Sequence, residues 1–198
     1  MLAVPPAFPP RPVNAMSTFV RLTKSGYYAD FVFYPVFLLL LAGAAFGRDT
    51  PMNWLIWLLL CAAGVAAWTL LEYWLHRIAF HRMPMLRKLH DLHHAMPTAK
   101  IGTPTWVTAG LICGGMLLPL WWEGGFNLAS GLTSGLAAGY LWYVTVHHAV
   151  HHWRQRPGSY LHRAKRRHAR HHYADQPCCF GVTTPLWDWV FHTLPLPR

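Results

Sequence analysis

The stretch 70-LLEYWLHRIAFHRMPMLRKLHDLHH-94 contains the transition from apolar to histidine-rich and basic sequence that decides the fold. It starts at the end of an uncharged apolar run, residues 51–71, which matches the roughly 20 residues that a helix needs to cross a bilayer. It continues with five histidines among basic residues. The sequence therefore predicts a membrane helix that leaves the hydrocarbon at a histidine-rich surface.

Three further uncharged runs, residues 31–47, 101–122 and 124–146, approach the same length. We therefore expect an all-α integral membrane protein with four transmembrane helices. The links between the first two runs and between the last two are too short for anything but hairpin turns, so the helices pair as two hairpins. The segment between the hairpins and the C-terminal tail then lie at one face of the membrane.

The distribution of charge orients that face. Of the 17 Lys and Arg residues, all except Arg48 fall on the side of the N-terminus, the inter-hairpin segment and the tail. The positive-inside rule makes this side cytosolic, so we expect both termini there. Residues 1–26, which are rich in proline, are expected to form a flexible cytosolic arm, and residues 27–198 a single membrane domain.

Composition narrows the possible functions. Hydrophobic residues make up 54% of the chain and charged residues 12%, well below the roughly 25% charged content of a soluble domain. A net charge of +10 on a chain with long apolar runs suits anionic lipid headgroups, and we expect no nucleic-acid partner. The four cysteines show neither a disulfide framework nor a zinc-type spacing.

The histidines indicate a metal centre on the cytosolic face, because none of them lies in residues 1–75 or 95–146. His90, His93 and His94 stand at i, i+3 and i+4, which puts all or part of the trio on one helix face, and the tail repeats this pattern. Neutral imidazole binds iron, zinc, copper and nickel. Ten well-placed rings exceed the needs of one ion, so we predict two ions with four or five ligands each. The predicted ligands are His76, His81, His90, His93, His94, His147, His151, His168, His171 and His172.

Other spacings leave alternatives open. His76 and His81 are five residues apart on an uninterrupted helix, which fits two ligands on different bearings or ligands of two different metals. His148 and His152 repeat the one-turn spacing of the predicted ligands beside them, so one pair can face inward while the other faces a neighbour or water. Glycines at 131, 135 and 139 would let a neighbouring helix approach the last apolar run closely.

Taken in order, the histidine motifs resemble those of the fatty acid hydroxylase superfamily, which includes sphingolipid fatty acid 2-hydroxylases, sterol desaturases and sterol oxidases. The resemblance covers about residues 30 to 195. The matching motifs are His76-x4-His81, His90-x2-His93-His94, His147-x3-His151, His168-x2-His171-His172 and the closing segment 180-FGVTTPLWDWVF-191.

This resemblance implies a four-helix membrane base and a small cytosolic helical cap that holds a histidine-ligated dimetal centre. It also implies two iron ions, O2 as the co-substrate and an external electron donor, cytochrome b5-like or ferredoxin-like. Zinc outranks ferrous iron in intrinsic affinity and can replace it in purified samples. The chain departs from the family in a shorter gap between His81 and His90 and in His192, and we expect no fused cytochrome b5 domain.

Metal-bound histidines need partners that fix ring orientation. We select Glu72, one turn before His76, and Asp188, within the closing segment, for this supporting role at the catalytic centre. The simpler alternatives are that Glu72 pairs with a nearby arginine and that Asp188 caps a helix.

The sequence thus predicts an O2-dependent di-iron lipid hydroxylase that inserts oxygen into an aliphatic C–H bond. We expect oxidation near the polar end of a fatty acyl chain, because the metals lie just outside the hydrocarbon and the cap has few apolar runs to line a tunnel. A desaturase or a sterol or carotenoid oxidase would use the same dimetal site. A divalent-metal transporter would need polar ligands at the middle of the spans, where this sequence has none.

Overall fold

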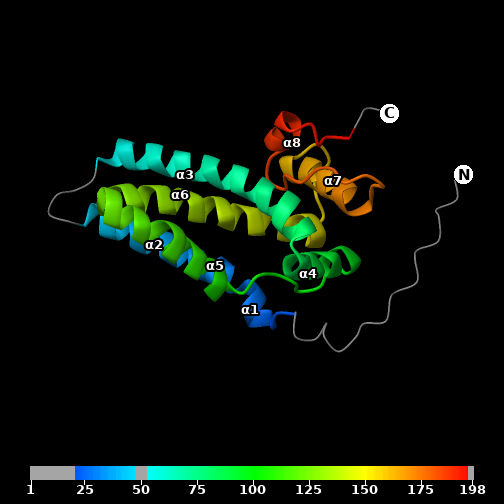
Figure 1. The fold of residues 1–198 in the computed structure, drawn as a ribbon, viewed down its shortest axis with the longest axis horizontal. Helices are drawn as coiled ribbons and strands as arrows, with labels where there is room; N and C mark the ends of the chain where they lie inside the picture. Colours follow the sequence, from blue (N-terminus) through cyan, green and yellow to red (C-terminus); the bar gives the residue numbers. More distant parts are fainter. Residues whose placement is uncertain (1–20, 48–52, 196–198) are drawn as a thin grey trace, which may run out of the picture.

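The computed structural model describes residues 21–47 and 53–195, and this part of the chain is mostly helical and contains no strand (Figure 1). Most of the predicted N-terminal arm, together with Arg48 and the first predicted turn, lies outside the described residues. The helices are α1 (Lys24–Tyr28), α2 (Asp30–Phe46), α3 (Trp54–Trp74), η2 (Leu75–Phe80), α4 (Pro84–Ala95), α5 (Thr105–Ile112), η3 (Cys113–Leu117), α6 (Leu118–His152), α7 (Tyr160–Tyr173) and α8 (Leu186–Val190).

Three helical segments are long and apolar enough to cross a membrane, whereas the sequence predicted four. They are Lys24–Phe46, Trp54–Phe80 and Thr105–His152. The difference lies in the third segment, in which helical structure continues through both of the last two apolar runs. Its backbone leaves helical geometry at Gly125, with φ 78° and ψ 165°, and in Figure 1 the chain runs toward this end of the bundle along α5 and away from it along the later part of α6. The count of four crossings remains a prediction.

The outer faces of the long helices are apolar. Leu39 and Leu40 on α2 and Leu59 on α3 each expose more than three fifths of their surface. Exposure of such a continuous apolar surface to water is unfavourable, whereas lipid chains would cover it. The helices are therefore built to pack against lipid.

Glycines bring α3 and α6 into close contact, as their spacing on α6 predicted. A Cβ atom on Gly135 would clash with the carbonyl oxygen of Cys61, and one on Gly64 would clash with the carbonyl oxygen of Leu132. Gly139 faces the Trp68 side chain in the same way, because a Cβ atom added at Gly139 would lie only 2.6 Å from the Cβ atom of Trp68. The two backbones therefore touch at positions that no larger residue can occupy.

The remaining short helices gather at one end of this bundle (Figure 1). Pro84 starts α4, where a missing backbone N–H costs nothing. The Ser159 hydroxyl caps α7 by accepting a hydrogen bond from the His162 N–H. A small apolar core of Val146, Val150, Ala164 and Val182 joins α6, α7 and the closing segment.

Replacement of Gly135 by valine should destabilise the bundle by about 1–3 kcal/mol or more, because α3 cannot move away without losing its other contacts. Gly110→Val is the matched control, because Gly110 is exposed and a Cβ atom there meets nothing within 4 Å. Thermal unfolding in detergent measures the effect. Equal melting temperatures for the two variants would contradict the close contact.

Candidate metal centre

The structure gathers the predicted ligands into two adjoining clusters at the end of the bundle. Cluster I contains His76, His81, His90, His94 and His171, and cluster II contains His93, His147, His151 and His168. Within each cluster, one ligand nitrogen from every histidine lies within 4.8 Å of all the others. His172 completes the ten, since its Nε2 lies 3.1 Å from Nε2 of His168 and its ring stacks on His94 at 4.2 Å.

The two His-x-x-His-His triplets are each divided between the clusters. On α4, His90 and His94 belong to cluster I and His93 to cluster II. On α7 the division is reversed, because His171 belongs to cluster I and His168 to cluster II. Both helices therefore contribute histidines to both clusters, which holds the two clusters next to each other.

The spacing of His76 and His81 is explained by a π-helical turn, η2, which occupies Leu75–Phe80. In an α-helix, residues five apart point in different directions, but a π-helix repeats after roughly that interval. The two rings stack 5.5 Å apart and both join cluster I. Their place in one cluster favours ligation of the same ion. The helix continues without a break from α3 into η2.

Backbone carbonyls fix the tautomer of two ligands. His76 Nδ1 donates to the Phe180 carbonyl oxygen at 2.6 Å, and His171 Nδ1 donates to the Cys178 carbonyl oxygen at 2.9 Å. With its proton on Nδ1, each neutral ring carries a lone pair on Nε2 that points into cluster I.

The distances between Nε2 atoms fit bound metal ions. His94 Nε2 lies 3.0 Å from His90 Nε2 and 3.1 Å from His171 Nε2. His151 Nε2 lies 2.8 Å from His168 Nε2 in cluster II. Lone pairs this close repel unless a cation lies between them, and such separations suit neighbouring nitrogens each about 2.1 Å from one first-row ion. The donor sets therefore fit two metal ions.

Burial keeps the rings neutral. It lowers the pKa of His93 and His171 to about 3 and that of His172 to about 2, with further lowering from neighbouring histidines. The pKa of His94 falls to about 4 for the same reasons. Neutral imidazole is the form that binds metals, so these ligands need no deprotonation at neutral pH.

The two selected carboxylates hold the closing segment rather than the rings. Glu72 accepts hydrogen bonds from the backbone N–H groups of Val182 and Thr183 and from the Thr183 hydroxyl, at 2.6 to 2.9 Å. Asp188, fully buried, accepts from the N–H groups of Phe180 and Gly181 and from the Thr193 hydroxyl. Neither simpler alternative holds, since Glu72 pairs with no arginine among the described residues and the cap position of α8 is Pro185.

The remaining histidines lie outside the clusters. His148 forms a hydrogen bond through Nδ1 with the Tyr27 hydroxyl at 3.0 Å and stacks on His152. His192 is exposed and has a positive φ of 54°. His162 lies on the basic helix α7 and belongs to neither cluster.

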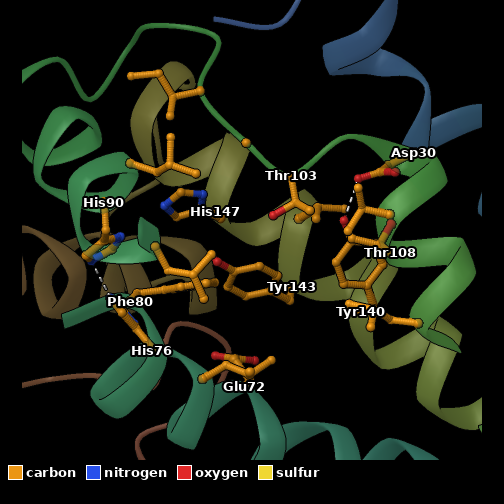
Figure 2. Close-up of a pocket in the computed structure, with 18 of the residues that line it drawn as sticks. Asp30, Glu72, His76, Phe80, His90, Thr103, Thr108, Tyr140, Tyr143 and His147 are labelled. Carbon is orange, nitrogen blue, oxygen red and sulfur yellow. Dashed lines mark hydrogen bonds between the residues drawn. The ribbon is translucent and has the colours of Figure 1, made fainter. Parts of the chain in front are cut away.

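A cavity of about 620 Å³ opens next to the clusters. Apolar residues of the long helices line much of it, among them Trp68, Leu111 and Met116. His76, His90, His93, His147 and His151 line one end. Figure 2 shows His76, His90 and His147 at this end, Tyr143 in the middle, and Asp30, Thr103, Thr108 and Tyr140 at the other end.

Comparison with known proteins identifies the family that shares these histidines. The family model of fatty acid hydroxylases matches residues 61–193, which include all ten histidines and the closing segment. The chain belongs to the fatty acid hydroxylase family.

Curated members of this family are similar over about two thirds of the chain. Fatty acid 2-hydroxylase of Macaca fascicularis is 36% identical over 66% of the chain and 38% of its own length. Dihydroceramide fatty acyl 2-hydroxylase FAH2 of Arabidopsis thaliana is 35% identical over 69% of the chain and 61% of its length. Ceramide very long chain fatty acid hydroxylase SCS7 of Saccharomyces cerevisiae is 34% identical over 72% and 39%. The chain thus spans about two fifths of several of these hydroxylases.

A solved structure has the same fold. Full-length Scs7p, of which only the hydroxylase domain is visible, superposes with a TM-score of 0.76 and 27% identity, covering 93% of this chain and 71% of that one. Since so much of the chain superposes, the arrangement of helices around the histidines is that of a fatty acid hydroxylase domain.

Fully loaded protein should contain two metal ions per chain. The reason is that two separate sets of converging lone pairs are present, and one ion cannot reach both. Elemental analysis of protein purified after iron or zinc supplementation measures the ratio. A ratio of one or less at saturation would contradict two sites.

Asp188→Asn should lower metal affinity by about 10-fold to 100-fold, the usual effect of disturbing a partner that orients a ligand. An asparagine cannot accept from both Phe180 and Gly181, so the carbonyl that holds His76 shifts. Asp175→Asn, an exposed carboxylate in the same tail, is the control. Competition with a chelator gives the two affinities. Equal affinities would show that the closing segment does not orient the ligands.

Proposed function

We propose that this chain is a membrane-bound, O2-dependent di-iron hydroxylase that inserts oxygen into an aliphatic C–H bond of a fatty acyl chain. The observation that carries the proposal is the junction of a largely apolar cavity with two clusters of neutral histidines. Iron, when bound to these clusters, supplies O2 activation and oxidising power. Relatives named as fatty acid 2-hydroxylases and ceramide hydroxylases support the lipid substrate.

The residues of the chain bind and orient the substrate. Trp68, Leu111 and Met116 offer apolar contacts that suit an acyl chain. They offer few hydrogen-bonding groups to water, so a bound acyl chain would displace it. His90 and His147 lie at the cavity wall, so a carbon at that end lies next to both clusters. Since the cavity is lined largely by the long helices, an acyl chain enters it from the bilayer rather than through a tunnel in the cap.

We further propose that Thr105–His152 crosses the membrane twice, with its turn near Gly125, and that the short helices form a cytosolic cap. The positive-inside rule supports a cytosolic position for both termini and the metal centre. Electrons then come from an external donor at the cytosolic face, cytochrome b5-like or ferredoxin-like. The basic surface of α7, with Arg163, Lys165 and Arg166, suits an acidic donor.

Expression of the active chain should produce a hydroxylated acyl lipid with the new oxygen at the second or third carbon. His90→Ala, His147→Ala and His168→Ala should each abolish this product, because every one of them removes a ring from a cluster. His162→Ala should retain nearly full activity. Lipid mass spectrometry of expressing cells checks both expectations. A product oxidised in mid-chain, or a double bond in place of a hydroxyl, would refute the proposed reaction.

A further inference from the structure

A second cavity, of about 540 Å³, lies between α3, α6, α7 and the closing segment. It shares no lining residue with the larger cavity, and none of the ten cluster histidines lines it. Its charged lining residues are Arg163 and Arg167, both on α7, and no carboxylate of the described residues lines it. The second cavity is therefore suited to an anion, whereas the larger one is largely apolar.

Arg167 has an unpaired hydrogen-bonding edge. Its Nε and Nη2 atoms are buried and have no hydrogen-bond partner in the part of the chain that the structure describes. Within residues 21–47 and 53–195 the ion pair is between Arg87 and Asp91, so no carboxylate there pairs with Arg167. The N–H groups on Nε and Nη2 point the same way, so together they match two oxygens of one phosphate or carboxylate. A buried guanidinium edge without partners is costly, and a bound anion would remove that cost.

Two neighbouring side chains offer further donors to the second cavity. Arg163 donates one of its N–H groups to the Gly158 carbonyl oxygen at 2.5 Å and has others left to donate. The Thr184 hydroxyl accepts from the Leu186 N–H at 3.2 Å, and its own proton has no acceptor among the described residues. An anion with several oxygens, such as a phosphate, can use all of these donors.

The long helices give the second cavity an apolar wall. Val65 of α3 and Trp142 of α6 line it and are 40% and 49% exposed, so both also belong to the outer surface that lipid would cover. Trp142 stacks on Tyr160 of α7 at 5.9 Å. Tryptophan is typical of the boundary between hydrocarbon and headgroups. The second cavity therefore lies where the phosphate of a lipid meets its acyl chains.

We propose that the second cavity binds the phosphate of an anionic phospholipid, separately from the substrate. Arg167 donates to two phosphate oxygens, Arg163 and Thr184 donate to the others, and the acyl chains extend over Val65 and Trp142. A choline headgroup fits less well, because its cation would lie near two arginines. The bound lipid holds α7, which carries three of the ten cluster histidines, against α3 and α6. The inference does not depend on which reaction the metal centre catalyses.

The test compares dioleoyl-phosphatidylglycerol with dioleoyl-phosphatidylcholine, which carry the same acyl chains and phosphate but differ in net charge. Native mass spectrometry of the full metal-loaded chain in neutral detergent gives the number of bound lipids and their affinities. The wild type should bind one phosphatidylglycerol about tenfold or more tightly than phosphatidylcholine. Arg167→Gln should lose this preference, as expected from losing hydrogen bonds between charged groups. Arg166→Gln, which removes an exposed arginine of α7 outside the second cavity, should keep it.

A second variant blocks the cavity without changing its charge, in case Arg167→Gln does not fold. Val65→Trp fills the cavity from the outer side of α3 and should also abolish the preference for phosphatidylglycerol. Leu59→Trp, at an exposed position of α3 outside the second cavity, is the control and should keep it. Equal affinity of the wild type for the two lipids would overturn the site, as would an unchanged preference in Arg167→Gln or Val65→Trp. Displacement of the lipid by an equal concentration of inorganic phosphate would also overturn it, because the site would then bind small anions without using the acyl chains.

Discussion

Ten imidazole rings have to remain neutral while their Nε2 atoms converge on two points. Charged rings about 3 Å apart would repel each other strongly, and neutral rings bring lone pairs into contact. Bound cations relieve both problems. His81 directly follows η2, and the other rings come from η2, α4, α6 and α7, so the two clusters also join the short helices to the long ones. Metal binding at these clusters would therefore be coupled to folding of this end of the protein.

The closing segment gives the ligands their orientation. Its carbonyls at Cys178 and Phe180 accept the Nδ1 protons of two rings of cluster I, and two buried carboxylates hold the segment in place. The carboxylates thus act on the backbone, and the backbone acts on the rings. The ring orientations in cluster II are less firmly fixed, because Nδ1 of His168 has no hydrogen-bond partner among the described residues. The two clusters would consequently hold their ions with unequally oriented ligand sets.

Much of this could be predicted from the sequence. Hydropathy and charge placed both histidine groups at one face, and helical spacing identified the ten rings that the structure gathers. The glycine contacts of α6 followed from spacing as well. The π-helical turn did not, since hydropathy does not distinguish a repeat of i+5 from i+4. The carbonyls that orient His76 and His171 were also missed, because every residue carries a carbonyl and only tertiary packing selects one.

One side of the larger cavity is formed by a single helix, α6. Tyr140, Tyr143, His147 and His151 are three or four residues apart along α6, so they share one face, and all of them line the cavity. The sequence suggested oxidation near the polar end because the cap seemed too small for a tunnel. In the structure the cavity lies mainly between the long helices, and residues of α4 and of the link that follows it, among them Leu89 and Thr103, also line it. The separation of the two tyrosines from the two histidines along this side of the cavity is set by the rise of a single helix.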